Sequence, residues 1–129
     1  MEQQDSPAVA LARAHAEAWS NHDWDKARAM LARDVHVISQ SIQPGLPATD
    51  VIGVDDYMEG LKKFAQAVVP GSARLVASIG DKRSSLILLT VAATIPDGAK
   101  VTLPAARLAL WDENRKMIQE RVIFFALSD

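Results

Sequence analysis

The sequence predicts an α+β protein: a cone-shaped barrel in which three N-terminal helices pack on a curved, mostly antiparallel sheet. Two observations predict this class. Four strand-like runs follow one another in the second half of the chain, joined by connections too short to hold a crossover helix. Three segments with helical spacing of apolar residues lie in the first half. Helices and strands that are segregated along the chain in this way are typical of α+β domains.

The first two helices are predicted from their caps. Ser6-Pro7 marks a helix start, because a serine hydroxyl caps the first turn and proline at the first helical position loses no hydrogen bond. This helix covers Ala8 to Ser20. Asp23 can cap a second, short helix that ends near Ala32.

A strand, a loop and a third helix follow. The strand covers Val35 to Ser39. The segment from Ser39 to Gly53 contains two prolines and no periodicity, so we expect a mobile loop there that gates a cavity. The third helix begins at Asp55 or Asp56 and ends before Val69-Pro70-Gly71. Its predicted buried stripe consists of Met58, Leu61, Phe64, Ala65 and Val68.

The last four strands form an antiparallel meander. They are predicted at Arg74–Ile79, Ser84–Ile95, Lys100–Trp111 and Lys116–Leu127. Turn residues such as Pro96-Asp97-Gly98 separate them. Pro104 falls inside the third of these strands, and because proline cannot donate to a sheet ladder, we expect a bulge there.

The turn before the last strand sets a register. If Asp112 to Arg115 form a four-residue loop, Trp111 pairs with Lys116 and Arg107 lies opposite Glu120. Both then share a sheet face with apolar residues. That face also carries Ile87, Leu89, Ala109, Ile118, Val122 and Phe124. A buried ion pair on such a face costs desolvation energy. It is therefore either part of a functional cluster or a structural cross-strand pair in which each charge only neutralises the other.

The run from Leu86 to Ala93 does not alternate apolar and polar residues. Both faces of the sheet are therefore expected to be covered, one by the helices and the other by a second copy of the chain. The predicted homodimer face is lined by Leu86, Leu88, Ala106, Leu108 and Leu110.

Composition narrows the function classes. The 129 residues form one domain, with a net charge of −2 and no basic run, which argues against nucleic acid or a membrane surface as partner. No apolar run is long enough to span a membrane, and the acidic first residues do not resemble a signal peptide, so a cytoplasmic protein is expected. The chain has no cysteine, three histidines without paired spacing and no glycine-rich phosphate loop. We therefore expect neither a metal nor an organic cofactor.

Three stretches resemble the SnoaL-like branch of the nuclear transport factor 2-like superfamily. They are Trp19-Ser20-Asn21-His22-Asp23-Trp24-Asp25 leading into Leu31-Ala32-Arg33-Asp34-Val35, the Gly53-led third helix, and Leu110-Trp111-Asp112-Glu113-Asn114-Arg115-Lys116-Met117. The resemblance implies the cone-shaped fold with an internal pocket. Ketosteroid isomerase, limonene epoxide hydrolase, scytalone dehydratase and polyketide cyclases share that fold.

The resemblance also implies site positions. The isomerase's oxyanion-binding tyrosine corresponds to His15, its general base to Ser39 and its second oxyanion donor to Arg107. None of these residues is the isomerase's own, so the resemblance implies a pocket without assigning a reaction.

The candidate catalytic residues are His15, Arg107 and Glu120. His15 would act as acid or base, Glu120 as a carboxylate oriented by Arg107, and Arg107 as a stabiliser of enolate-like charge. His15 could equally be a hydrogen-bonded core residue. The candidate ligand-binding residues are Ser39, Trp19, Tyr57 and Phe124.

Two functions remain open. The first is a cofactor-free cyclase, isomerase or hydratase that takes a small, largely apolar molecule. The second is a non-catalytic dimeric module that binds a small molecule or a protein, because the isomerase's aspartates are replaced at Ser39 and Arg107.

Overall fold

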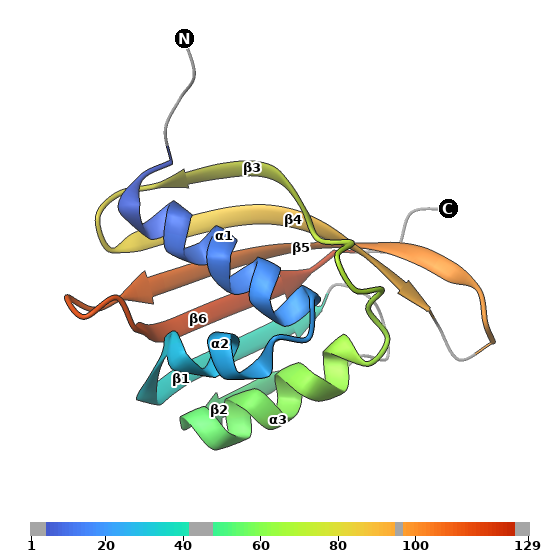
Figure 1. Cartoon of the computed structure of the whole chain (residues 1–129), viewed down its shortest axis with the longest axis horizontal. Helices are drawn as coiled ribbons and strands as arrows, with labels where there is room; N and C mark the ends of the chain where they lie inside the picture. The colour runs from blue at the N-terminus through green and yellow to red at the C-terminus, as the bar shows by residue number, and fades with distance from the viewer. Residues whose placement is uncertain (1–4, 42–47, 95–96, 126–129) are drawn as a thin grey trace, which may run out of the picture.

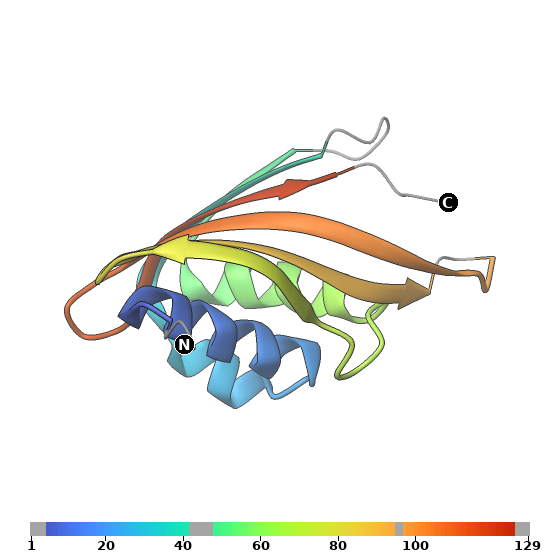
Figure 2. The same ribbon diagram turned by 90° about the horizontal axis from the view of Figure 1, so that it is seen from above.

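We analysed a computed structural model of the chain, which describes residues 5–41, 48–94 and 97–125. Six strands form one curved, unclosed sheet in the order β2-β1-β6-β5-β4-β3. All three helices lie on the same side of this sheet, as Figures 1 and 2 show. The elements are α1 (Pro7–Ser20), α2 (Trp24–Ala29), β1 (Leu31–Ser41), β2 (Thr49–Ile52), α3 (Val54–Ala65), β3 (Arg74–Gly80), β4 (Ser84–Thr94), β5 (Lys100–Trp111) and β6 (Met117–Phe124). The predicted α+β class, its three helices and the four-stranded meander are confirmed.

Most predicted caps are confirmed. Ser6 Oγ accepts a hydrogen bond from the Val9 backbone N–H at 3.2 Å, and Asp23 accepts one from Lys26. The expected extent of the second helix was wrong, because α2 ends at Ala29 and the chain enters β1 at Leu31.

The third helix begins one residue earlier than predicted. Gly53 is its N-cap and has a φ of +108°, a backbone conformation that residues with a Cβ rarely adopt. Asp55 and Asp56 lie in the first turn instead of capping it, where their carboxylates face the positive end of the helix dipole.

The segment predicted as a single loop, residues 39–53, contains regular structure. β1 extends to Ser41, and β2 pairs with it antiparallel, with Ser39 opposite Thr49. A four-residue strand is too short to reveal its period in the sequence. The remaining part of the expected gating loop, residues 42–47, lies outside the described residues.

β1 runs parallel to β6 in the middle of the sheet. This pairing places Val37 beside Glu120 and Ser39 beside Val122. Residues separated by some 80 positions in sequence thereby share the inner face of the sheet, which faces the helices.

The predicted register between the last two strands was wrong. Trp111 pairs with Met117, and Glu120 lies opposite Ala109 rather than Arg107. A register shift at this end of the ladder leaves Ile118 as an extra residue in β6. Ile118 therefore faces outward and is 40% exposed. Met117 takes the inner position that we predicted for Ile118.

The bulge that we expected at Pro104 is absent. Pro104 pairs with Thr90 in an unbroken β4–β5 ladder, and its carbonyl accepts a hydrogen bond from the Phe125 N–H. Ile87 pairs with Arg107, which confirms that both lie on the same sheet face, as predicted.

The inner face of the sheet and the helices enclose the core. Trp19, Trp111, Ile87 and Leu89 are among its largest fully buried side chains. Alternate residues of β4 point outward, so that Leu86 is 41% exposed although Ile87 is buried. In a single chain the helices thus cover one face, and the outer face of β4 and β5 carries accessible apolar side chains.

Candidate functional site

A cavity of about 420 Å³ opens between α3 and the inner face of the sheet. Its walls come from α3 and from strands β1, β2, β5 and β6. The lining residues are Val37, Ser39, Gln40, Ser41, Thr49, Val51, Asp56, Tyr57, Gly60, Leu61, Phe64, Leu103, Arg107, Glu120, Val122 and Phe124. Most of this lining is apolar, which is typical of pockets for small molecules.

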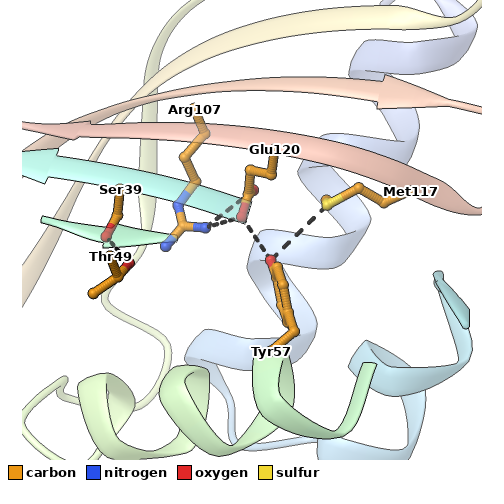
Figure 3. A network of polar contacts seen from close by, with 6 residues as sticks. All are labelled: Ser39, Thr49, Tyr57, Arg107, Met117 and Glu120. Carbon is orange, nitrogen blue, oxygen red and sulfur yellow. Dashed lines mark hydrogen bonds and ion pairs between the residues drawn. The ribbon is translucent and has the colours of Figure 1, made fainter. Parts of the chain in front are cut away.

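A buried polar cluster forms part of the cavity wall. Nη1 of Arg107 donates to both carboxylate oxygens of Glu120 at 3.1 Å, and the Tyr57 hydroxyl donates to Oε1 of Glu120 at 2.7 Å (Figure 3). Tyr57 also approaches the Met117 sulfur at 3.9 Å. Each of these contacts to Glu120 comes from a donor, as an ionised carboxylate requires.

Three elements bring this cluster together. Arg107 lies on β5, Glu120 on β6 and Tyr57 in the first half of α3. The Arg107 guanidinium carbon also lies 4.9 Å from the centre of the Trp19 ring, which α1 supplies. This cation–π contact adds attraction on the face of the guanidinium, where no hydrogen bond can form.

The environment fixes the charge states of the cluster. Burial alone would lower the pKa of Arg107, but the Glu120 carboxylate and Tyr57 raise it overall, so that Arg107 stays charged. Burial, followed by the nearby Glu120 charge, raises the pKa of Tyr57 well above its usual value of 10. Tyr57 is therefore a hydrogen-bond donor at neutral pH and cannot act there as a base.

His15 lies near this cluster but does not line the main cavity. Its ring centre is 6.2 Å from that of Tyr57, and the residue is only 2% exposed. Burial, opposed by Glu120 and assisted by Arg107, lowers the pKa of His15 to about 4. The imidazole is therefore neutral at pH 7 and lacks the acidic second proton of an imidazolium, which a histidine uses as a general acid.

The side of the cavity carries a second polar pair. The hydroxyls of Ser39 on β1 and Thr49 on β2 are hydrogen-bonded to each other. Figure 3 shows the second terminal nitrogen of Arg107 directed away from Glu120, on the side where Ser39 and Thr49 lie. Asp56 contributes an exposed carboxylate to the lining.

The other two histidines lie outside the cavity. His36 makes a 2.6 Å contact with Asp50, and His22 Nε2 contacts the Ala65 carbonyl at 3.0 Å while its ring stacks on Trp24. Within residues 5–41, 48–94 and 97–125, no three histidine, aspartate or glutamate side chains are grouped to hold a metal ion. No helix in these ranges is long and apolar enough to cross a membrane.

The structure brings five of the seven predicted site residues to the cavity. These are Ser39, Tyr57, Arg107, Glu120 and Phe124. His15 and Trp19 line instead a small chamber on the other side of the ion pair. Tyr57 is only 5% exposed, because its hydroxyl is bonded to the buried Glu120.

Sequence reasoning missed part of the lining. Thr49 lies in β2, which was predicted as loop and therefore had no assigned face. Val37 could have been found, because it alternates with Ser39 along the same strand. Met117 was hidden by the bulge at Ile118, which reverses the alternation of β6.

The Arg107–Glu120 pair gives a testable expectation for stability. Arg107→Ala should lower the free energy of unfolding by about 3–5 kcal/mol, because it leaves a buried carboxylate without its partner. The combined change Arg107→Met, Glu120→Leu and Tyr57→Phe removes all three polar groups and should recover most of this loss. Urea denaturation of the purified variants measures both effects.

A matched control is the exposed ion pair between Arg28 and Asp55. Arg28→Ala should cost less than about 1 kcal/mol, as surface pairs do. An equally small loss of stability for Arg107→Ala would show that Glu120 does not depend on Arg107 for compensation of its buried charge.

The chain matches the model of the SnoaL-like domain over residues 12–116. None of the curated proteins compared with it gives a match. Solved structures with the same fold include an NTF2-like protein of unknown function from Burkholderia pseudomallei, with 19% identity, coverage of 93% of this chain and 92% of the other, and a TM-score of 0.72.

Two Mycobacterium tuberculosis proteins also share the fold. One is an LEH-like epoxide hydrolase, 19% identical over 92% of this chain and 82% of its own, with a TM-score of 0.69. The other was solved in complex with estradiol-17beta-hemisuccinate and is 13% identical over 92% of this chain and 93% of its own, with a TM-score of 0.72. The structural matches confirm the fold, and the family match covers most of the sequence. This chain therefore belongs to the SnoaL-like domain family.

Proposed function

We propose that this protein binds a small, neutral, largely apolar molecule in the main cavity, with one polar group of the ligand directed at Arg107. The observation that carries the proposal is an apolar cavity of about 420 Å³ with a buried, hydrogen-bonded ion pair in its wall. A few polar groups in an apolar pocket orient a ligand, and the apolar walls supply most of its affinity.

The charges of the lining favour a neutral ligand over an anion. Glu120 already neutralises Arg107, and Asp56 adds a further negative charge. A carboxylate ligand would therefore lose its hydration without gaining an unpaired cation. The aromatic rings of Phe64 and Phe124, whose centres are 5.4 Å apart, support a ligand with a flat apolar body.

Binding can be tested with two probes of matched shape. We expect 2-acetylnaphthalene, a neutral ketone, to bind about tenfold more tightly than 2-naphthoate, a difference of about 1.4 kcal/mol. Gly60→Trp should abolish binding, because Gly60 lines the cavity and a Cβ there meets nothing within 4 Å. Isothermal titration calorimetry measures both.

Gly60→Ala is the control for this variant. It adds only a methyl group to an exposed helical position and should leave the affinity unchanged. Tighter binding of the carboxylate, or equal binding to the Gly60→Trp variant, would refute the proposed ligand class or its location.

A second candidate function is acid–base catalysis of the isomerase, cyclase or hydratase kind. The 2.7 Å hydrogen bond between Tyr57 and Glu120 favours it, because a proton donor and a potential base meet at the cavity wall. Glu120 would remove a proton from carbon next to a carbonyl. The electron pair would move to the carbonyl oxygen, and Arg107 would stabilise the resulting enolate. The alternative remains a non-catalytic binding module.

Proton exchange separates these two functions. In D₂O, a catalytic Glu120 should speed the replacement of the methyl protons of 2-acetylnaphthalene by deuterium, which proton NMR follows directly. Glu120→Gln should bring the rate down to that of buffer. If the protein binds the ketone and the rate equals that of buffer, the cavity is a binding site without this chemistry.

We further propose that the protein forms a homodimer through the outer face of its sheet. Leu86, Leu108 and Leu110 are 38–41% exposed on this face, and Leu88 and Ala106 between them are half-buried. Contiguous apolar surface of this kind is typical of interfaces. A second copy of the chain is the occupant we favour. In a two-fold dimer the same face of both chains forms the interface, so the apolar patch of one copy would cover that of the other.

The assembly can be tested by light scattering. Wild type should scatter as a dimer at micromolar concentration, and Leu86→Glu should scatter as a monomer, because it places a charge between the apolar side chains of Ile79 and Leu108. Ile52→Glu, on the exposed edge strand β2, should leave the dimer intact. A monomeric wild type would exclude the proposed interface.

A further inference from the structure

A second, small chamber lies behind the ion pair, between α1 and the sheet. Its volume is about 10 Å³, which is about the space that a single water molecule needs. It is lined by Ala12, His15, Ala16, Trp19, Ile87, Arg107, Ala109, Met117 and Glu120. Arg107 and Glu120 line both this chamber and the main cavity, so the ion pair is the wall between them.

Three buried nitrogen atoms belong to residues around this chamber and have no hydrogen-bond partner among the described residues. They are Nε2 of His15, Nε1 of Trp19 and Nε of Arg107. The three residues are between 0% and 6% exposed. Buried polar atoms in native proteins are nearly always satisfied, by protein or by ordered water.

We propose that the chamber is a binding site for one ordered water molecule, held by His15, Trp19 and Arg107. The donors and acceptors match this ligand. The indole N–H and the guanidinium Nε–H can only donate, and a water oxygen accepts two hydrogen bonds. The same water donates to Nε2 of His15, which gives the three bonds typical of buried waters.

The state of His15 supports this arrangement. Burial lowers the pKa of His15 to about 4, so the ring is neutral at pH 7 and one of its nitrogens is an acceptor. An uncharged donor–acceptor ligand suits the chamber better than a cation does, because Arg107 is charged and adjacent.

The water gives His15 a role as a positioning residue. It couples the imidazole to Nε of Arg107, while Nη1 of the same guanidinium is held by Glu120 and its face by Trp19. The guanidinium is then fixed on three sides. Its remaining nitrogen keeps the direction away from Glu120 that Figure 3 shows.

Water in the chamber can be detected in the intact protein. A crystal structure that resolves ordered solvent should show a water within hydrogen-bond distance of His15 Nε2 and Arg107 Nε. In solution, magnetic relaxation dispersion of the water deuteron signal should count one more long-lived internal water in wild type than in His15→Phe. His15→Phe keeps a ring of similar size and removes the acceptor, whereas His15→Gln keeps polar atoms and should retain the water.

The resonance of the Arg107 Nε–H adds a readout that a purely structural role would not move. In wild type this proton should show a cross-peak to the long-lived water, and the cross-peak should disappear in His15→Phe. His36→Gln, which changes a histidine that lines neither the cavity nor the chamber, should change neither measurement.

An empty chamber in the wild-type crystal, or equal water counts for wild type and His15→Phe, would overturn the proposal. The wild-type measurements decide the question even if the phenylalanine variant does not fold. They need no ligand in the main cavity, so they are independent of the proposed function.

Discussion

The buried ion pair between Arg107 and Glu120 is the constraint on which the rest of the structure depends. Removing two charges from water costs several kcal/mol per ion, on the order of the whole stability of a small domain. This cost is offset only while the partners stay within hydrogen-bond distance and their other atoms are satisfied. The pair itself provides 3.1 Å contacts, Tyr57 adds a charge-assisted bond of 2.7 Å, and Trp19 covers the face of the guanidinium. Since α3 supplies Tyr57 and α1 supplies Trp19, the docking of both helices on the sheet is part of what keeps the charges in place.

The parallel pairing of β1 with β6 gives this ion pair a cavity to face. β6 is the last strand of the meander, and β1 lies beside it on the side away from β5. The pairing extends the inner face beyond Glu120 to Val37 and Ser39, and β2 extends it further to Thr49. Because the sheet curves and does not close, α3 spans the concave side without filling it. The polar pair therefore borders an open apolar space on one side and the closely packed face of α1 on the other.

Local signals in the sequence were enough to predict most of the fold. The caps at Ser6 and Asp23, the apolar stripe of α3 and the turns of the meander each act within a few residues of one another, so a single sequence reveals them. The short strand β2 and the start of α3 at Val54 were missed because no local signal in the sequence marks them. A four-residue strand has no measurable period, and a glycine N-cap has no side chain to recognise. The cavity residues followed from knowing which face of each strand points inward. His15 and Trp19 were assigned to the same cavity, because the sequence cannot show on which side of Arg107 a helix lies.

A single extra residue in β6 sets the geometry of the ion pair. Without the bulge at Ile118, the pairing of Trp111 with Met117 would continue unshifted, so Glu120 would lie opposite Leu108 and point to the outer face of the sheet. With it, Glu120 lies opposite Ala109, and Arg107 lies opposite Val122, so the ion pair runs diagonally across the two strands. A diagonal approach lets one terminal nitrogen of the guanidinium serve both carboxylate oxygens. A parallel, two-nitrogen fork would have engaged the guanidinium more fully. This diagonal pairing leaves Nε without a hydrogen-bond partner among the described residues and the second terminal nitrogen directed away from Glu120. The same arginine therefore lines both compartments.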